Sequence, residues 1–134
     1  MMTTDMYDAQ VDSIKVEDIA TNYNNRIVLE RIRTNEKGTS SNYLYIQNHY
    51  DNVEEEECID YVPEGAYDMG WLGYFISKGD CLKELYIRDF EPTSGASFMD
   101  VIKPFFSGLT NNKSINMLNF SVMDLLGGCQ IFNM

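Results

Sequence analysis

The chain has 134 residues and a mass of 15.4 kDa, which is enough to build one hydrophobic core. Hydrophobic residues make up 44% of it, so the composition excludes a wholly disordered chain. The net charge of -11 excludes a surface that binds nucleic acid or an anionic membrane, because both need clusters of Lys and Arg. An acidic chain favours a basic partner.

Neither a membrane span nor a secretory leader is indicated. No stretch approaches the roughly 18 apolar residues that cross a bilayer, and residues 1–18 lack a basic flank with an apolar run. We therefore expect a cytoplasmic protein, with the nucleus not excluded. Cys58, Cys81 and Cys129 are odd in number and widely spaced, which predicts free and mostly buried thiols.

The first third of the chain predicts a tail followed by one helix and one strand. Residues 1–21 are acidic and show no sustained period, so we expect a disordered acidic tail there. Residues 24–36 carry apolar positions at helical spacing with Arg and Glu between them, which predicts an amphipathic helix. A break at 37–41 precedes residues 43–46, whose aromatic and β-branched side chains predict a strand.

Residues 48–67 predict an exposed acidic loop. Four consecutive glutamates, Glu54 to Glu57, lie in it. Their carboxylates raise the alternative of a calcium or magnesium site, but the order of an EF-hand is absent, so we expect no metal. The lone His49 has no Cys or Ser partner in a recognisable motif, and we expect no catalytic residue and no enzyme activity.

The next segment predicts a second helix and strand. Asp68 is a candidate N-cap for a helix that runs through Ile76 and ends at the Gly79-Asp80 break. Residues 82–87 alternate in the manner of a strand.

A third helix and strand follow a turn. Ser97 is a candidate N-cap for a helix that extends to Leu109 and is interrupted by Pro104. Residues 115–120 then predict a further strand.

These helix and strand units repeat. Leu85 and Leu118 lie 33 residues apart, and the segments around them, 82–87 and 115–120, both read apolar-x-x-Leu-x-apolar. The same offset places Leu72 over Phe105, Ile76 over Leu109 and Gly79 over Asn112. Residues 41–46 form a weaker third copy, with Leu44 lying 41 residues before Leu85. A repeated helix and strand predicts stacked units with neighbouring parallel strands.

The strand pattern Leu82-x-x-Leu85-x-Ile87 resembles the ribonuclease-inhibitor-like leucine-rich repeats. The resemblance implies an α/β leucine-rich-repeat solenoid with short parallel strands and an outer layer of helices. About three repeats would occupy residues 22–134, and the last would be incomplete, with the chain ending inside its helix. Spacings of 33 and 41 exceed the family's usual range of about 20 to 29, which insertions on the convex side would explain.

Two other repeat families are less compatible with the sequence. A period of 33 also suits ankyrin repeats, but no Thr-Pro-Leu-His stretch occurs. The segment Trp71 to Tyr74 is too compressed for the tetratricopeptide pattern, and strands are foreign to that all-helical repeat.

A binding surface is expected on the strand residues that alternate with the buried ones. Stacking would place them in rows, because successive side chains of a strand point to opposite faces. One row contains Tyr45, Tyr86 and Asn119, a second Tyr43, Glu84 and Met117, and a third Gln47, Arg88 and Ser121. From these rows the predicted partner-binding residues are Tyr43, Tyr45, Glu84, Tyr86, Arg88 and Asn119.

The predicted function is protein binding on the concave strand face, since Tyr and Arg are common interface anchors. The alternative is a structural or capping segment of a longer solenoid that has no binding site of its own. Neither hypothesis needs a cofactor. We expect a monomer, unless the open C-terminal edge pairs with a second copy.

Overall fold

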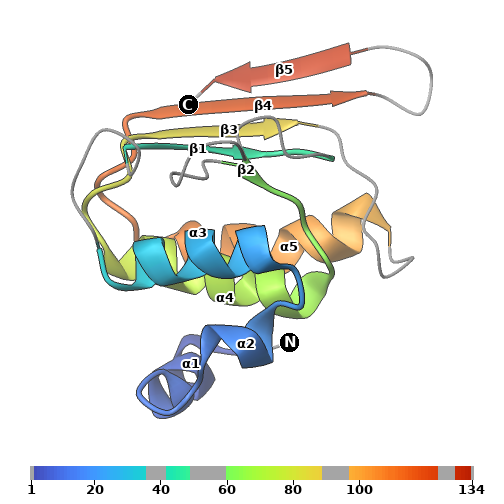
Figure 1. Ribbon diagram of the computed structural model, residues 1–134. Helices are drawn as coiled ribbons and strands as arrows, with labels where there is room; N and C mark the ends of the chain where they lie inside the picture. Colours follow the sequence, from blue (N-terminus) through green and yellow to red (C-terminus); the bar gives the residue numbers. More distant parts are fainter. Residues whose placement is uncertain (1, 36–41, 49–59, 89–96, 124–128, 134) are drawn as a thin grey trace.

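The computed structural model describes residues 2–35, 42–48, 60–88, 97–123 and 129–133. These residues form a mixed α/β fold in which a five-stranded sheet packs against a layer of helices on one of its faces (Figure 1). Two short N-terminal helices lie on the far side of that helix layer, away from the sheet (Figure 1).

The sheet has the order β2-β1-β3-β4-β5. Its first four strands are parallel, and β5 is antiparallel to β4. Leu85 pairs with Leu118, and Leu44 pairs with Leu85, so both predicted repeat offsets are confirmed as the strand register. The strands are β1 Tyr43–Ile46, β2 Asp60–Tyr61, β3 Glu84–Arg88, β4 Met117–Met123 and β5 Cys129–Asn133.

Three helices form the layer against the sheet: α3 Tyr23–Arg33, α4 Ala66–Lys78 and α5 Phe98–Leu109. Each falls where the periodicity predicts it. Ser97 caps α5, and its hydroxyl accepts the backbone N–H of Asp100 at 3.2 Å. The helix continues through Pro104 without a break, contrary to the predicted interruption.

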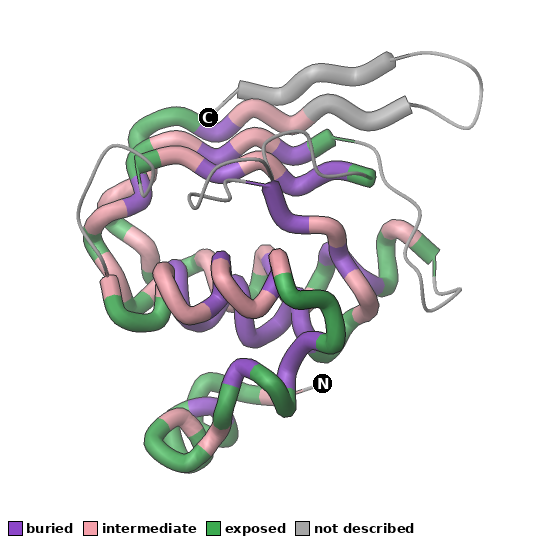
Figure 2. The backbone as a smooth tube through the Cα atoms, in the orientation of Figure 1, coloured by how far each residue is buried: buried purple, intermediate pink, exposed green. Residues whose placement is uncertain are grey.

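The core lies between the sheet and α4, which is the central helix. The inward residues of the strands, such as Leu44, Leu85 and Ile87, are almost fully buried. The nine consecutive residues 68–76 of α4 are buried too, as the purple tube of Figure 2 shows. This helix is apolar on all sides because it contacts α3, α5 and the N-terminal helices.

Glycines allow α4 and α5 to approach closely. A Cβ added to Gly73 would lie 2.5 Å from the carbonyl oxygen of Phe105, and one added to Gly108 would lie 2.7 Å from the backbone of Gly73. Both contacts are with backbone atoms, which cannot rotate away. The two backbones therefore pack against each other, and the crossing requires glycine at both positions.

The N-terminal segment differs from the disordered tail predicted for residues 1–21. It contains α1 Thr4–Gln10 and α2 Val16–Ile19, and Tyr7 is buried. The Tyr7 ring meets Trp71 edge-on at 4.7 Å between centroids and stacks on Tyr74 at 5.1 Å. A few isolated apolar residues, spaced too irregularly to show a period, are sufficient here because α4 supplies the surface that they cover.

The C-terminal segment also differs from its prediction. Residues 129–133 form β5 rather than the helix of an incomplete repeat, and they pair with β4. Ile131 and Phe132 favour a strand, and the edge of β4 supplies the backbone partners that a short terminal helix would lack.

The predicted acidic loop at 48–67 is shorter than expected. Its end forms β2, in which Asp60 and Tyr61 are buried, and α4 already begins at Ala66. Asp68 is the third residue of α4 rather than its N-cap, and its carboxylate accepts the backbone N–H of Gly65 at 2.7 Å. Several residues of the sequence predictions lie outside the described residues: the break at 37–41, His49, Glu54 to Glu57, and Cys58.

Candidate functional site

The outward residues of β1, β3 and β4 share one face of the sheet, and no described helix or strand covers it (Figure 1). Tyr45 pairs with Tyr86, which pairs with Asn119, as the predicted row requires. All six predicted site residues therefore lie together. We call this surface the tyrosine face; it comprises Tyr43, Tyr45, Glu84, Tyr86, Arg88, Met117 and Asn119.

The centre of the tyrosine face is a stacked pair of rings. Tyr45 and Tyr86 lie 4.7 Å apart between centroids with 15° between their planes. Tyr43 meets Tyr45 edge-on at 6.1 Å, and the Arg88 guanidinium lies 5.3 Å from the centroid of the Tyr45 ring. The three tyrosines are partly exposed and Arg88 is exposed. Mutual stacking restricts these rings, so a partner would meet a surface that is already ordered.

Glu84 holds the hydroxyl of Tyr86. That hydroxyl donates to Glu84 Oε1 at 2.7 Å and lies 3.2 Å from the sulfur of Met117. The hydrogen bond to the carboxylate favours the protonated phenol and, with partial burial, raises the pKa of Tyr86 to about 12. Tyr86 is therefore a neutral hydrogen-bonding group at physiological pH, and the carboxylate beside it carries the charge.

A polar chain supports Arg88 from the neighbouring strands. Its Nη1 donates to Gln47 Oε1 at 3.4 Å, and Gln47 Nε2 donates to Asp60 Oδ1 at 2.9 Å. Gln47 and Asp60 are both buried. The sequence predicts the row that contains Gln47, but it places Asp60 in the acidic loop. The signal for Asp60 is the short run Ile-Asp-Tyr-Val at 59–62 before a proline, which the adjacent glutamates obscure.

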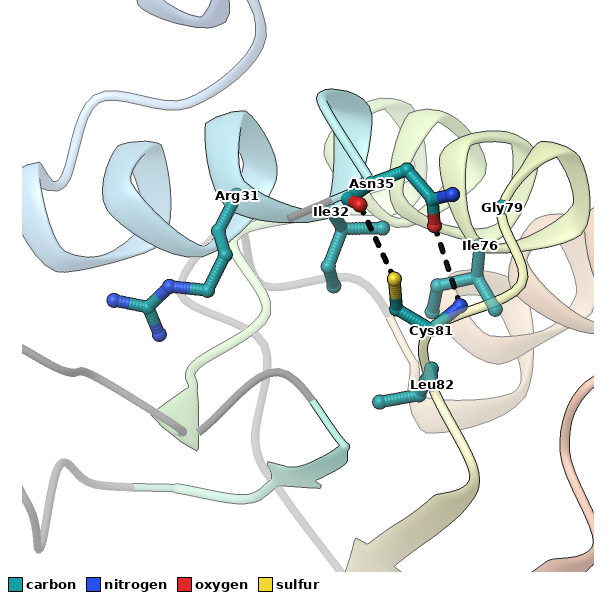
Figure 3. Close-up of a pocket in the computed structure, with 7 residues that line it drawn as sticks. All are labelled: Arg31, Ile32, Asn35, Ile76, Gly79, Cys81 and Leu82. Atoms are coloured by element: carbon teal, nitrogen blue, oxygen red, sulfur yellow. Dashed lines mark hydrogen bonds between the residues drawn. The ribbon is translucent and has the colours of Figure 1, made fainter. Parts of the chain in front are cut away.

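A small cavity lies away from the tyrosine face, between the end of α3 and the start of β3 (Figure 3). Its volume of about 10 Å³ leaves room for little more than one water molecule. The Cys81 thiol donates to the carbonyl of Asn35 at 3.1 Å, and the Asn35 side chain accepts the N–H of Cys81 at 3.2 Å. Cys81 is a free thiol, as predicted, and it joins two chain segments.

The described residues contain no group of three or more His, Cys, Asp and Glu side chains that could hold a metal ion. No described helix has the length and apolar character of a membrane span. The groups that the tyrosine face offers are aromatic rings, one carboxylate and one guanidinium, which are the groups of a binding surface.

No protein-family model matches the chain, and no curated protein or solved structure matches it.

Proposed function

We propose that this protein is an interaction module of the leucine-rich-repeat type that binds a basic protein or peptide segment on its tyrosine face. The observation that carries the proposal is the partly exposed stack of Tyr45 and Tyr86, with Arg88 beside it, on the uncovered face of the sheet. Tyr and Arg are among the side chains that most often supply binding energy at protein interfaces.

The arrangement lowers the entropic cost of binding. Long side chains usually lose rotamer freedom when a partner immobilises them, at about 0.5–1.5 kcal/mol each. Here Tyr86 is held by its ring stack and by Glu84, and Arg88 is held by Gln47. The paired strands beneath fix the backbone, so the rings keep their positions.

The preference for a basic partner rests on charge. The net charge of -11 attracts cations over a distance, which raises association rates at low salt. On the face itself, the tyrosine rings offer π surfaces to Lys or Arg, and Glu84 offers a carboxylate. Arg88 lies over the Tyr45 ring in the free protein, so we expect contact with the partner to centre on Tyr86 and Glu84.

A peptide-display selection against the purified chain tests this proposal. The selected peptides should be enriched in Lys and Arg, and Tyr86→Ala should weaken their binding by about 1–3 kcal/mol, the range of an aromatic hot spot. The matched control is Tyr23→Ala, because Tyr23 is a 72% exposed tyrosine on α3, in the helix layer. Peptides that bind both variants with the affinity of the unmodified protein would refute the assignment of the face.

The alternative function is a structural segment of a longer solenoid. The repeated helix and strand register of β1, β3 and β4 favours it, because such repeats stack side by side. Under that hypothesis the display selection yields no peptide that depends on Tyr86. On the β4 side, however, the position for a further parallel strand is occupied by β5.

A further inference from the structure

An apolar groove runs along the flank of α5, on the helix side of the sheet and therefore opposite the tyrosine face. Its volume is about 550 Å³. Phe106, Leu109 and Ile115 are only partly buried there, although each packs against the edge of the core. The described residues that line the groove are Phe106, Leu109, Thr110, Asn112, Ile115 and Leu118.

The internal repeat shows what such a surface accommodates. Shifted back by 33 residues, the four apolar residues of the groove fall on Gly73, Ile76, Leu82 and Leu85. Those residues are buried, with Ile76 at 1% and Leu85 at 0% exposure. Part of their cover is α5 itself, whose Phe105 and Gly108 pack against Gly73. The surface equivalent to the groove is thus covered by a helix one repeat earlier.

We propose that the groove is the docking site for an amphipathic helix of a partner protein, which lies beside α5 as α5 lies beside α4. The groove continues the helix layer α3-α4-α5, so such a helix extends an interface that the fold already uses. This mode of recognition places apolar residues at positions i, i+3, i+4 and i+7 into a hydrophobic groove.

The occupant differs from α5 in how closely it approaches. Phe106 stands at the position equivalent to Gly73, so the backbone contact between α4 and α5 cannot be repeated. The partner helix therefore packs through side chains at the usual interaxial distance of about 8–10 Å. The residues that flank its apolar face are basic, because the chain that receives it has a net charge of -11.

The partner contributes a helix without a strand. A further repeat of a solenoid would place a parallel strand next to β4, but β5 already pairs there in the antiparallel direction. The helix position remains open while the strand position is filled. This distinguishes the proposed occupant from a further repeat of the same kind.

The probe for this site is a lactam-bridged helical peptide of about 16 residues, with Leu at the four groove positions and Lys at the flanking positions. Isotope-edited NMR of the full chain should show shifts at Phe106, Leu109 and Ile115. Leu109→Gln should raise the dissociation constant about tenfold or more, because it places an amide in the apolar contact. The control is Met99→Gln, which changes a 56% exposed residue of α5 outside the groove and should leave the constant unchanged.

Three outcomes would overturn the proposal. In one, the probe binds more weakly than about 1 mM, the limit of a specific contact. In another, Leu109→Gln binds the probe as tightly as the Met99→Gln control. In the third, sedimentation shows a dimer that Leu109→Gln abolishes, which would make a second copy the occupant. Tyr86→Ala should not affect the probe, so this test succeeds or fails independently of the tyrosine face.

Discussion

The two faces of one sheet show how a single alternation separates stability from recognition. Leu85 and Tyr86 are neighbours on β3; Leu85 is fully buried against the helices, whereas Tyr86 is partly exposed. The same holds for Leu44 and Tyr45 on β1. The covered face should therefore determine the free energy of unfolding, and the tyrosine face should affect it little while determining affinity.

The largest expected effect is on the covered face. Leu85→Ala should lower the free energy of unfolding by about 2–5 kcal/mol, because it removes buried methyl groups and leaves a cavity in a core that includes Leu44 and Leu118. Urea unfolding measures the loss. A change below about 0.5 kcal/mol, the range of surface substitutions, would contradict the division between the faces.

The next effect concerns a buried carboxyl on the helix side. Burial raises the pKa of Asp68 to about 6, although Tyr61, Glu64 and Gly65 donate hydrogen bonds to it. Between about pH 4 and pH 6 the folded chain thus holds a proton on Asp68 that the unfolded chain has lost. The resulting contribution to stability is fully present below about pH 4 and is lost as the pH rises through about 6, a change on the order of 2–3 kcal/mol.

Replacing Asp68 with asparagine isolates this contribution from that of other groups. The nearby Glu64 is retained in both proteins; burial alone would raise its pKa, but hydrogen bonds from Thr21, Asn25 and Asn22 outweigh burial and lower it. The free energy of unfolding of the unmodified protein, minus that of Asp68→Asn, should be largest near pH 4 and should fall as the pH rises through about 6. Above about pH 7 it should be constant, because Asp68 is then ionised in both the folded and the unfolded chain.

Urea unfolding of the two proteins across this pH range measures the difference. A difference that stays constant from about pH 4 to about pH 7 would contradict the raised pKa of Asp68.

A smaller effect is expected where the helices cross. Gly73→Ala places a Cβ against the carbonyl of Phe105, and overpacking of this kind costs about 1–3 kcal/mol. Alanine is also the better helix former by about 1 kcal/mol, so a net loss of stability shows that the contact outweighs propensity. Ser107→Ala, at an exposed position of α5, is the control and should change stability by less than about 0.5 kcal/mol. A Gly73→Ala protein as stable as the control would mean that the helices can separate without loss.

The smallest effect on stability is expected on the tyrosine face. Glu84→Gln removes the charge that holds the Tyr86 hydroxyl, so the pKa of Tyr86 should fall from about 12 towards its ordinary value of about 10. Ultraviolet titration of the tyrosines measures this shift, and the free energy of unfolding should change by less than about 0.5 kcal/mol. An unchanged titration would show that Glu84 does not hold the hydroxyl in solution.

The strand register and the membership of the tyrosine face could be predicted from the sequence. Alternation along a strand is a local property, and the offset of 33 residues from Leu85 to Leu118 carries the alternation from one strand to the next. The rows of Tyr45 and Tyr86 follow from those two facts alone. The side-chain geometry within the rows, including the ring stack and the hydrogen bond to Glu84, does not follow, because rotamers depend on neighbours from other strands.

The ends of the chain were decided by tertiary contacts. Tyr7 has no periodic neighbours in the sequence, yet the surface of α4 at Trp71 and Tyr74 orders its helix. Residues 129–133 are strand because the edge of β4 was open to them. Local pattern determines an element when its own residues bury one another in repeating units. Where burial depends on a surface formed elsewhere in the chain, only the folded structure decides, since the stabilising contacts are distant in sequence.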